Sequence, residues 1–285
     1  TAALYGFGKN EELLGRVLKD RRSEYILASK CGLFKDAETG KRLIDARPEV
    51  IRKTCEDALT RLQTDVIDLY YLHRWDQHVP IEDSIGEMSR LLEEGKVRAL
   101  GMSEVSADTL RRAHAVHPLA ALQTEYSLWS RNAEIAVLDA CKELGISFVA
   151  FSPLARQFLT GILTDPENQL EEGDIRRNMP RFHQENYAKN ILLIEEYRNI
   201  ALKVDCTPAQ LALAWLLAQG EHIIPIPGTR HSNWAEENFN ALAVSLDEDV
   251  LNELDALINQ DTVVGNRYPD GVQGVEIDTE DFESA

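Results

Sequence analysis

Short apolar segments alternate with amphipathic segments along most of the chain. Each apolar segment has the length of a buried strand, and each amphipathic segment repeats its apolar residues along one helix face, as Leu13, Leu14, Val17 and Leu18 do. The predicted strands are residues 25–30, 66–73, 97–103, 121–127, 146–152 and 222–228. The predicted helices are residues 10–21, 49–62, 81–95, 107–116, 133–145, 188–204, 208–219 and 233–241. A long polar segment, residues 155–187, interrupts the alternation.

This alternation indicates a parallel sheet covered by helices, either a doubly wound sheet or a (β/α)8 barrel. Six strands are predicted, whereas a barrel has eight. The chain opens on a helix soon after Thr1 with no strand before it. The barrel interpretation therefore implies that two leading strands, about 40–50 residues, are missing from the front. No Pro/Ser-rich linker divides the chain, so we expect residues 1–285 to form a single domain.

Composition narrows the class of protein. The 285 residues are 44% hydrophobic, which excludes a disordered or collagen-like chain. The formal net charge of −18 disfavours nucleic-acid and anionic membrane partners, because both need a basic face. No run of about 18 apolar residues and no signal-peptide pattern occurs. Four widely spaced cysteines without a C-x-x-C pair favour reduced thiols and a cytoplasmic location.

The end of the chain is acidic. The last 18 residues, from Tyr268, contain six acidic side chains and no Lys or Arg. We expect an acidic, solvated tail over about 268–285 that carries a third of the net charge.

A metal site is not expected. His114 and His117 lie close in the sequence, but no Glu completes the zinc-protease pattern and Pro118 ends the helix. A solvated helix end accounts for both histidines.

Polar residues occur where the apolar strands end, at positions that turn residues usually occupy. They are Lys30, His73, Ser103 followed by Glu104, Gln123 inside its strand, Ser152 and Thr229. The carboxyl ends of the strands of a parallel barrel meet at one rim, where its active sites lie. Each residue alone also has a structural interpretation, since a strand-end Lys usually extends its charge to water. Together they favour a functional rim.

Tyr5, Lys30 and His73 suggest acid catalysis at a carbonyl. A phenol has a pKa of about 10, and a nearby ammonium lowers that pKa by favouring phenolate. A histidine can orient or relay the proton. Such a set suits protonation of a carbonyl oxygen as hydride arrives at its carbon. No G-x-S-x-G elbow indicates a serine hydrolase, and no carboxylate pair indicates a glycosidase.

A Rossmann dinucleotide site is not supported. Gly6 and Gly8 begin a G-x-G-x-x-G pattern, but Glu11 takes the third glycine position and no strand precedes it. A better anion site is Gly228–Thr229–Arg230, where a strand end leads into a helix N-terminus beside a guanidinium. An exposed loop arginine is the alternative interpretation.

Long ordered motifs over essentially the whole chain resemble those of the aldo-keto reductases. They are LYGFGKNEELLG (4–15), SKCGL (29–33), YYLHRWD (70–76), EEGKVRALGMSE (93–104), LQTEYSLW (122–129), VAFSPLARQFLTG (149–161), TPAQLALAWLLAQG (207–220) and IPIPGTRHSNWAEEN (224–238). The segment around residues 102–132 resembles the branch that contains plant alkaloid aldehyde reductases, auxin-induced-like proteins and fungal pyridoxal reductases.

The resemblance implies a (β/α)8 barrel that binds NADPH/NADP+ across its carboxyl-terminal rim and reduces aldehydes or ketones reversibly. Tyr5 matches the general acid, Lys30 the residue that lowers its pKa, and His73 the orienting histidine. The family's catalytic Asp falls just before Thr1, so the chain looks truncated at its front.

The same resemblance implies the cofactor-binding residues. Ser103 and Gln123 would hold the nicotinamide carboxamide, and Phe151 would stack on the ring in place of the usual Tyr. The pyrophosphate stretch matches Ser152, Leu154, Arg156 and Gln157. The 2′-phosphate and adenine positions match Gly228, Thr229, Arg230, Glu237 and Asn238. Glu104 replaces the family's usual Asn.

Trp75 and Trp129, each just past a strand, are expected to wall the substrate pocket. The expected partner is a small carbonyl compound. Two alternatives to a reductase remain: an NADPH-binding regulatory module resembling potassium-channel β subunits, and an inactive truncated product.

Overall fold

Six parallel strands form the central sheet. The computed structural model describes residues 1–35, 42–272 and 276–282. The strand order is β1-β4-β5-β6-β7-β8. The strands are β1 (Ala28–Cys31), β4 (Leu69–Leu72), β5 (Leu100–Ser103), β6 (Ala121–Glu125), β7 (Ser147–Phe151) and β8 (Ile223–Ile226). A separate antiparallel hairpin joins β2 (Leu33–Lys35) and β3 (Arg42–Ile44).

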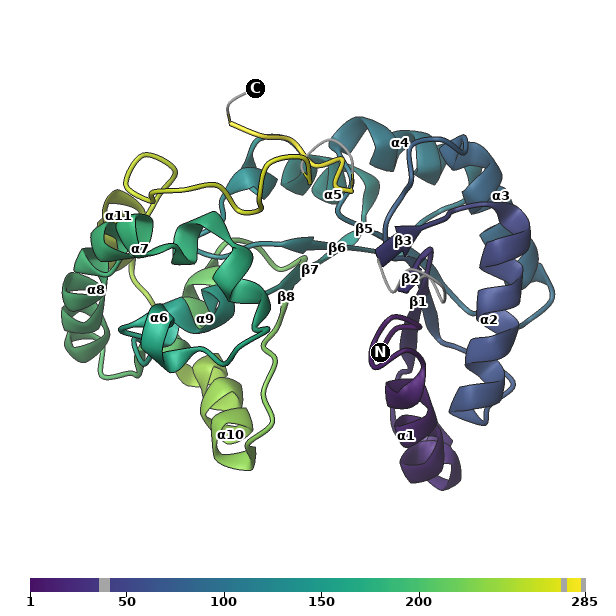
Figure 1. Cartoon of the computed structure of the whole chain (residues 1–285), viewed down its shortest axis with the longest axis horizontal. Helices are drawn as coiled ribbons and strands as arrows, with labels where there is room; N and C mark the ends of the chain where they lie inside the picture. Colours follow the sequence, from purple (N-terminus) through teal and green to yellow (C-terminus); the bar gives the residue numbers. More distant parts are fainter. Residues whose placement is uncertain (36–41, 273–275, 283–285) are drawn as a thin grey trace. The chain divides into compact units, whose positions relative to one another are not determined.

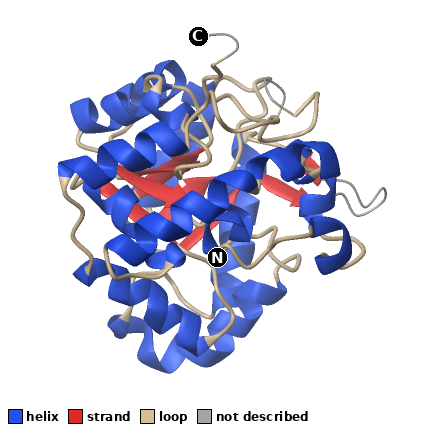
Figure 2. Ribbon diagram, turned by 90° about the vertical axis from the view of Figure 1, so that its left-hand side faces the viewer, coloured by secondary structure: helices blue, strands red, loops and turns tan. Residues whose placement is uncertain are grey.

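One helix precedes the first strand of the sheet, and the others follow strands along the chain. The helices are α1 (Lys9–Leu18), α2 (Pro48–Leu62), α3 (Ile81–Glu93), α4 (Ala107–Val116), α5 (Val137–Leu144), α6 (Pro166–Gln169), α7 (Gln184–Asn190), α8 (Leu192–Lys203), α9 (Pro208–Ala218), α10 (Ser232–Asn240) and α11 (Glu248–Leu257). Figure 2 distinguishes these helices from the strands by colour.

All six predicted strands are confirmed. Each strand is shorter than its apolar segment, because only part of the segment is paired with a neighbouring strand. The strand count fits a partial (β/α)8 barrel, as expected. Helix α4 has the predicted bounds. The hairpin β2–β3 was not predicted, because its strands are only three residues long, and helix α11 was not predicted, because no apolar strand segment directly precedes it.

The chain divides into two compact units, which we describe separately. Unit 1 contains Thr1–Gln123, Asp139–Ser147 and Gly274–Glu280, and unit 2 contains Thr124–Leu138, Phe148–Gln273 and Asp281–Ala285.

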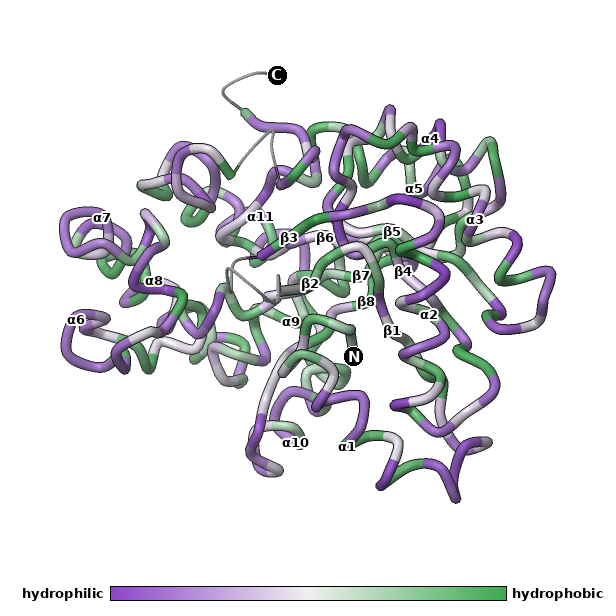
Figure 3. Tube along the Cα trace, turned by 45° about the vertical axis from the view of Figure 1, so that its right-hand side comes forward, coloured by the Kyte–Doolittle hydropathy of each residue, from purple (hydrophilic) through white to green (hydrophobic). Residues whose placement is uncertain are grey.

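In unit 1, successive helices pack on one another outside the strands. Contacts join α1 to α2, α2 to α3 and α3 to α4, beside β1, β4 and β5 (Figure 1). The hydrophobic residues of β4 and β5 lie inside this layer, while hydrophilic residues recur along the helices (Figure 3). Gly101 of β5 is required by this packing, because a Cβ there would lie 2.6 Å from the Tyr71 ring.

Helix α1 is attached to unit 1 by a buried carboxylate. Glu11, the residue that replaces the third glycine of a Rossmann pattern, is fully buried. Its carboxylate accepts hydrogen bonds from Ser29 Oγ at 2.6 Å and from Arg61 Nε at 2.7 Å. A buried carboxylate with two such partners is satisfied, and it fixes α1 against β1 and α2.

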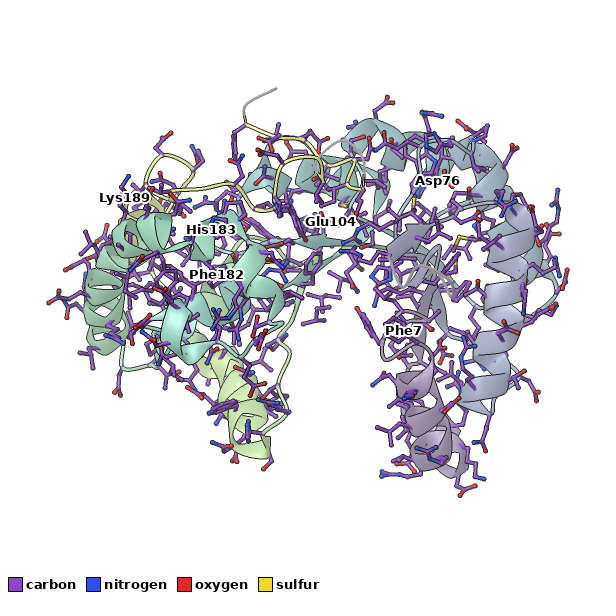
Figure 4. The ribbon with its side chains drawn as sticks, in the orientation of Figure 1. Phe7, Asp76, Glu104, Phe182, His183 and Lys189 are labelled. Carbon is purple, nitrogen blue, oxygen red and sulfur yellow. The ribbon has the colours of Figure 1, made fainter. Side chains whose placement is uncertain are left out.

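In unit 2, the polar segment 155–187 folds around aromatic rings. The Trp129 ring stacks on Phe158 with centroids 3.9 Å apart, and Phe182 meets Trp129 edge-on at 5.3 Å. Phe182 lies among the side chains of this segment and Lys189 on the outer face of α7 (Figure 4). These aromatic contacts were not predicted, since the apolar residues of the segment are too widely spaced to give a helical pattern in the sequence.

The expectation of a solvated acidic tail was wrong for residues 276–280, the part of the tail that the structure describes in unit 1. Ile277 is 2% exposed. Asp278 accepts hydrogen bonds from Ser106 N at 3.2 Å and Ser106 Oγ at 3.0 Å, and Glu280 accepts one from Ala107 N at 2.7 Å. Both carboxylates lie at the N-terminus of α4, where free N–H groups and the helix dipole favour negative charge. Residues 273–275 and 283–285 of the predicted tail lie outside the described part.

Cys31, Cys55 and Cys141 are buried free thiols, and Cys206 is a half-buried one. Among the described residues, no single helix is long and apolar enough to cross a membrane. One pair, residues 184–203 with 208–218, reaches the required length and apolarity only across a 79° bend.

We predict that Asp278→Ala weakens α4. Loss of a carboxylate at a helix N-terminus costs about 1 kcal/mol. Hydrogen exchange of the amides of residues 106–110 should accelerate, and the urea midpoint of unit 1 should fall. The matched control is Asp270→Ala, an exposed acid of the same acidic region. Equal exchange in the two variants would contradict the capping role.

Candidate active site

Strand register brings the predicted catalytic residues of unit 1 to one end of the sheet. Lys30 of β1 lies level with Tyr71 of β4, and His73 follows β4 directly. The His73 N–H donates to the carbonyl of Cys31 at 2.8 Å. Ser103 ends β5 and lies level with Gln123 of β6. Parallel strands share one polarity, so residues at their carboxyl ends meet at one edge.

Tyr5, Lys30 and His73 contact one another. Lys30 Nζ lies 3.4 Å from the Tyr5 hydroxyl and 3.1 Å from the carbonyl oxygen of Thr1. The Tyr5 and His73 rings meet edge-on with centroids 5.9 Å apart. Lys30 and His73 are buried, whereas Tyr5 is 41% exposed. The phenol is therefore the member of the set that remains open to a substrate.

The protonation states of this set follow from burial and from neighbouring cations. Desolvation, with a smaller effect of Arg74, lowers the pKa of Lys30 to about 8. Burial, followed by Arg74 and Lys30, lowers the pKa of His73 to about 2, so this imidazole is neutral at pH 7. Desolvation raises the pKa of Tyr5 above its ordinary value although Arg74 opposes the shift. The lowered phenol pKa expected from the sequence is thus not found, because desolvation of the phenolate outweighs the nearby positive charge.

Arg74 is a further charged residue of this site that the sequence patterns did not single out. Its side chain is buried, and Nη1 donates to the His73 carbonyl at 2.6 Å and to Ser103 Oγ at 3.0 Å. The signal was present in the motif YYLHRWD, where a charged residue directly follows a strand-end histidine.

The loop after β4 is fixed by Asp76. Its carboxylate accepts hydrogen bonds from the N–H groups of Ala46, His78 and Val79 at 2.9–3.0 Å (Figure 4). Trp75 is half-buried in this loop and donates from Nε1 to the Val79 carbonyl at 2.7 Å. The ring is held in a defined position, and a contact between it and substrate stays a prediction.

Trp129, the other residue expected to wall the substrate pocket, lies in unit 2. It is 3% exposed and covered by Phe158 and Phe182. Its ring therefore packs inside unit 2, and a direct contact with substrate stays a prediction.

The predicted pyrophosphate stretch follows β7 in unit 2 with a strained backbone. Ser152, Ala155, Arg156 and Gln157 have positive φ angles of 51°, 50°, 52° and 85°. Such conformations cost on the order of 1–3 kcal/mol per non-glycine residue and cluster at ligand-binding sites. Phe151 ends β7 and is half-buried, as is Leu154.

Arg156 pairs with the buried carboxylate of Glu125, which the sequence patterns did not single out. Its Nη2 lies 3.0 Å from Glu125 Oε2 and 3.2 Å from the Tyr268 hydroxyl. Arg267 lies 3.4 Å from the same Glu125 oxygen. Despite its burial, Glu125 has a pKa lowered to about 2, because the positive charges of Arg156, Arg267 and Arg181 outweigh desolvation. The sequence did contain a signal for Glu125, which is a charged residue inside the predicted apolar strand 121–127.

The predicted 2′-phosphate loop lies between β8 and α10. Gly228, Thr229 and Arg230 are exposed. The Thr229 hydroxyl accepts a hydrogen bond from the His231 N–H at 3.2 Å, and no side chain caps the N-terminus of α10. The open N–H groups and the guanidinium can hold an anion. Glu237 and Asn238 are half-buried later in the same helix.

Comparison with known proteins shows the family to which the chain belongs. The model of the aldo/keto reductase family matches residues 1–259. The chain therefore belongs to this family of oxidoreductases and has its (β/α)8 fold.

Individual relatives support the assignment to this family. The aldo-keto reductase yakc (NADP(+)) of Schizosaccharomyces pombe is 45% identical over 273 residues, which cover 94% of this chain and 80% of that protein. The glycerol dehydrogenase of Gluconobacter oxydans superposes with a TM-score of 0.84 at 31% identity, covering 95% of this chain and 82% of that one. An aldo/keto reductase from Klebsiella pneumoniae, solved with NADP and acetate, gives a TM-score of 0.70 at 26% identity and covers 94% and 82%.

We predict that Lys30 titrates well below an ordinary lysine, because burial lowers its pKa to about 8. Its ε-carbon signal in NMR, assigned by comparison with Lys30→Met, should have a midpoint near the pKa of about 8 that burial produces. The exposed Lys203, whose pKa is raised by its hydrogen bond with Glu253, serves as the control and should stay charged through this range. A Lys30 midpoint above pH 10 would contradict the desolvated environment.

Proposed function

We propose that this protein is an NADPH-dependent carbonyl reductase that converts aldehydes or ketones to alcohols reversibly. The observation that carries the proposal is the contact of 3.4 Å between Lys30 Nζ and a Tyr5 hydroxyl whose side chain is open to solvent. Membership of the family and the NADP(+) in the name of the yeast relative support it.

Tyr5 would donate a proton to the carbonyl oxygen. Its raised pKa keeps it protonated at neutral pH, so it is a competent acid. Lys30, charged below its pKa of about 8, would stabilise the phenolate that remains. His73 would be neutral, so its ring orients the substrate oxygen without adding charge.

Free hydrogen-bonding groups in unit 1 suit a nicotinamide cofactor. His73 Nδ1 and Arg74 Nε are buried without a partner among the described residues. Because Ser103 Oγ accepts from Arg74, its own hydrogen is available for a carboxamide oxygen. Ser103 and Gln123 would hold the carboxamide, and the bound cofactor would supply hydride to the carbonyl carbon.

The family resemblance assigns further residues to phosphate binding and to stacking. Arg230 and the uncapped N-terminus of α10 offer positive charge and N–H donors to a 2′-phosphate. Phe151 would stack on the nicotinamide, and the residues of the strained loop, Ser152, Leu154, Arg156 and Gln157, would contact the pyrophosphate. Arg156 would then share its charge between Glu125 and the cofactor.

We predict that Tyr5→Phe lowers kcat for NADPH-dependent aldehyde reduction by about 10²–10⁴-fold, because general acid catalysis is lost. NADPH absorbance with a panel of aldehydes measures turnover, and fluorescence titration should show unchanged NADPH binding. Tyr25→Phe is the control, since that hydroxyl donates to the Leu18 carbonyl instead. Unchanged turnover in Tyr5→Phe would refute Tyr5 as the acid, and tight NADPH binding without wild-type turnover would support the regulatory alternative.

We also predict that Arg230→Ala discriminates between cofactors. Loss of a charge-assisted contact should raise the Kd for NADPH by about 10–100-fold and leave that for NADH nearly unchanged, because NADH lacks the 2′-phosphate. The surface Arg21→Ala, which removes an exposed pair with Glu24, is the control. Equal weakening of both cofactors would argue against the assignment.

A further inference from the structure

The buried Arg74 differs in its environment from the half-buried arginines Arg22 and Arg156. It is 7% exposed, and among the described residues no carboxylate lies within ion-pair distance of it. By contrast, Arg22 pairs with Asp68 at 2.6 Å, and Arg156 pairs with Glu125 at 3.0 Å. A buried charge without a partner is strongly unfavourable, so its retention requires a compensating role.

The hydrogen bonds of Arg74 point to that role. Its Nη1 donates to Ser103 Oγ at 3.0 Å and to the His73 carbonyl at 2.6 Å, while Nε is buried without a described partner. The first bond fixes the Ser103 hydroxyl as an acceptor from Arg74 and leaves its hydrogen free to donate. The second places the guanidinium beside the backbone that positions His73.

The charge of Arg74 acts across the whole catalytic set. It contributes to the lowered pKa of Lys30 and of His73 and opposes the raised pKa of Tyr5. Unit 1 thus holds two buried cations, Lys30 and Arg74, at the end of the sheet where Ser103 lies. A further positive charge brought to this place is repelled by these two cations, and a neutral group is not.

We propose that Arg74 is a positioning residue with two effects: it orients the Ser103 hydroxyl toward the nicotinamide carboxamide, and its unpaired charge disfavours the oxidised cofactor relative to the reduced one. The inference rests on the proposed function. NADP+ and NADPH differ by one hydride, two electrons and a proton, so the oxidised ring is positive and the reduced ring neutral. The site therefore retains NADPH in preference to NADP+ and biases the protein toward carbonyl reduction.

The two effects are separated by two variants. Arg74→Gln keeps an N–H donor for Ser103 but removes the charge. Ser103→Ala keeps the charge but removes the hydroxyl. The readout is the Kd of NADPH and of NADP+, measured by calorimetry at pH 7 and fixed ionic strength, where Lys30 is charged in every variant.

Arg74→Gln should lower the ratio of the NADP+ Kd to the NADPH Kd by about tenfold, as expected for a nearby charge at an effective dielectric constant of about 20. Ser103→Ala should weaken both forms by the same factor and leave the ratio unchanged. Arg74→Lys, which retains the charge, should keep the ratio close to that of the wild type. A merely structural role of Arg74 would weaken both forms together.

An unchanged ratio in a folded Arg74→Gln variant overturns the charge effect, and unchanged affinities in Ser103→Ala overturn the orienting effect. Circular dichroism establishes folding, and Arg74→Met replaces Arg74→Gln if the latter does not fold. If wild-type protein binds neither cofactor form, the proposed function itself fails, which distinguishes the two results.

Discussion

The contact between the Lys30 ammonium and the Tyr5 hydroxyl is the interaction on which the chemistry proposed for unit 1 depends. It requires a cation to be buried at the end of a strand, beside a phenol that stays accessible. Register supplies the position, since β1 and β4 pair so that Lys30 lies level with Tyr71 and His73 follows immediately. The loop that carries Tyr5 is fixed in turn by hydrogen bonds from Tyr5 N to Ala2 and from Ala3 N to Lys30.

The same contact shows two opposing electrostatic effects. Burial destabilises the Lys30 ammonium and lowers its pKa to about 8, yet leaves it charged at neutral pH. Burial also destabilises the Tyr5 phenolate and raises the phenol pKa. The resting site therefore holds a neutral, protonated phenol beside a cation. The ammonium of Lys30 stabilises a negative charge on Tyr5 only once the proton has left. Stabilisation that develops with the reaction is the kind that accelerates it.

The two units differ in whether their buried charges have partners of opposite sign. In unit 1, Lys30 and Arg74 are cations with no described carboxylate within ion-pair distance. In unit 2, Glu125 lies among arginines and ties Arg156 to the segment that carries Tyr268. The first arrangement suits a neutral ring and a reacting carbonyl, and the second suits a loop that must hold a strained backbone. Glu11 and the half-buried Arg61 give a third case, where a buried carboxylate is satisfied by an arginine and attaches α1 to α2.

The sequence by itself determined the repeating architecture. Apolar strands and amphipathic helices have distinct periods, so all six parallel strands could be placed from local pattern, and so could the strand ends that carry Lys30, His73 and Ser103. The family motifs identified Tyr5, for which no periodicity argues. Tertiary structure alone decided what depends on contacts distant in sequence. Asp278 accepts a hydrogen bond from Ser106, 172 positions away in the sequence. Arg74 donates to Ser103, and Arg156 pairs with Glu125. A charged residue gives the same local signal whether it is solvated or buried, because only the folded chain sets the desolvation and the partners that distinguish the two.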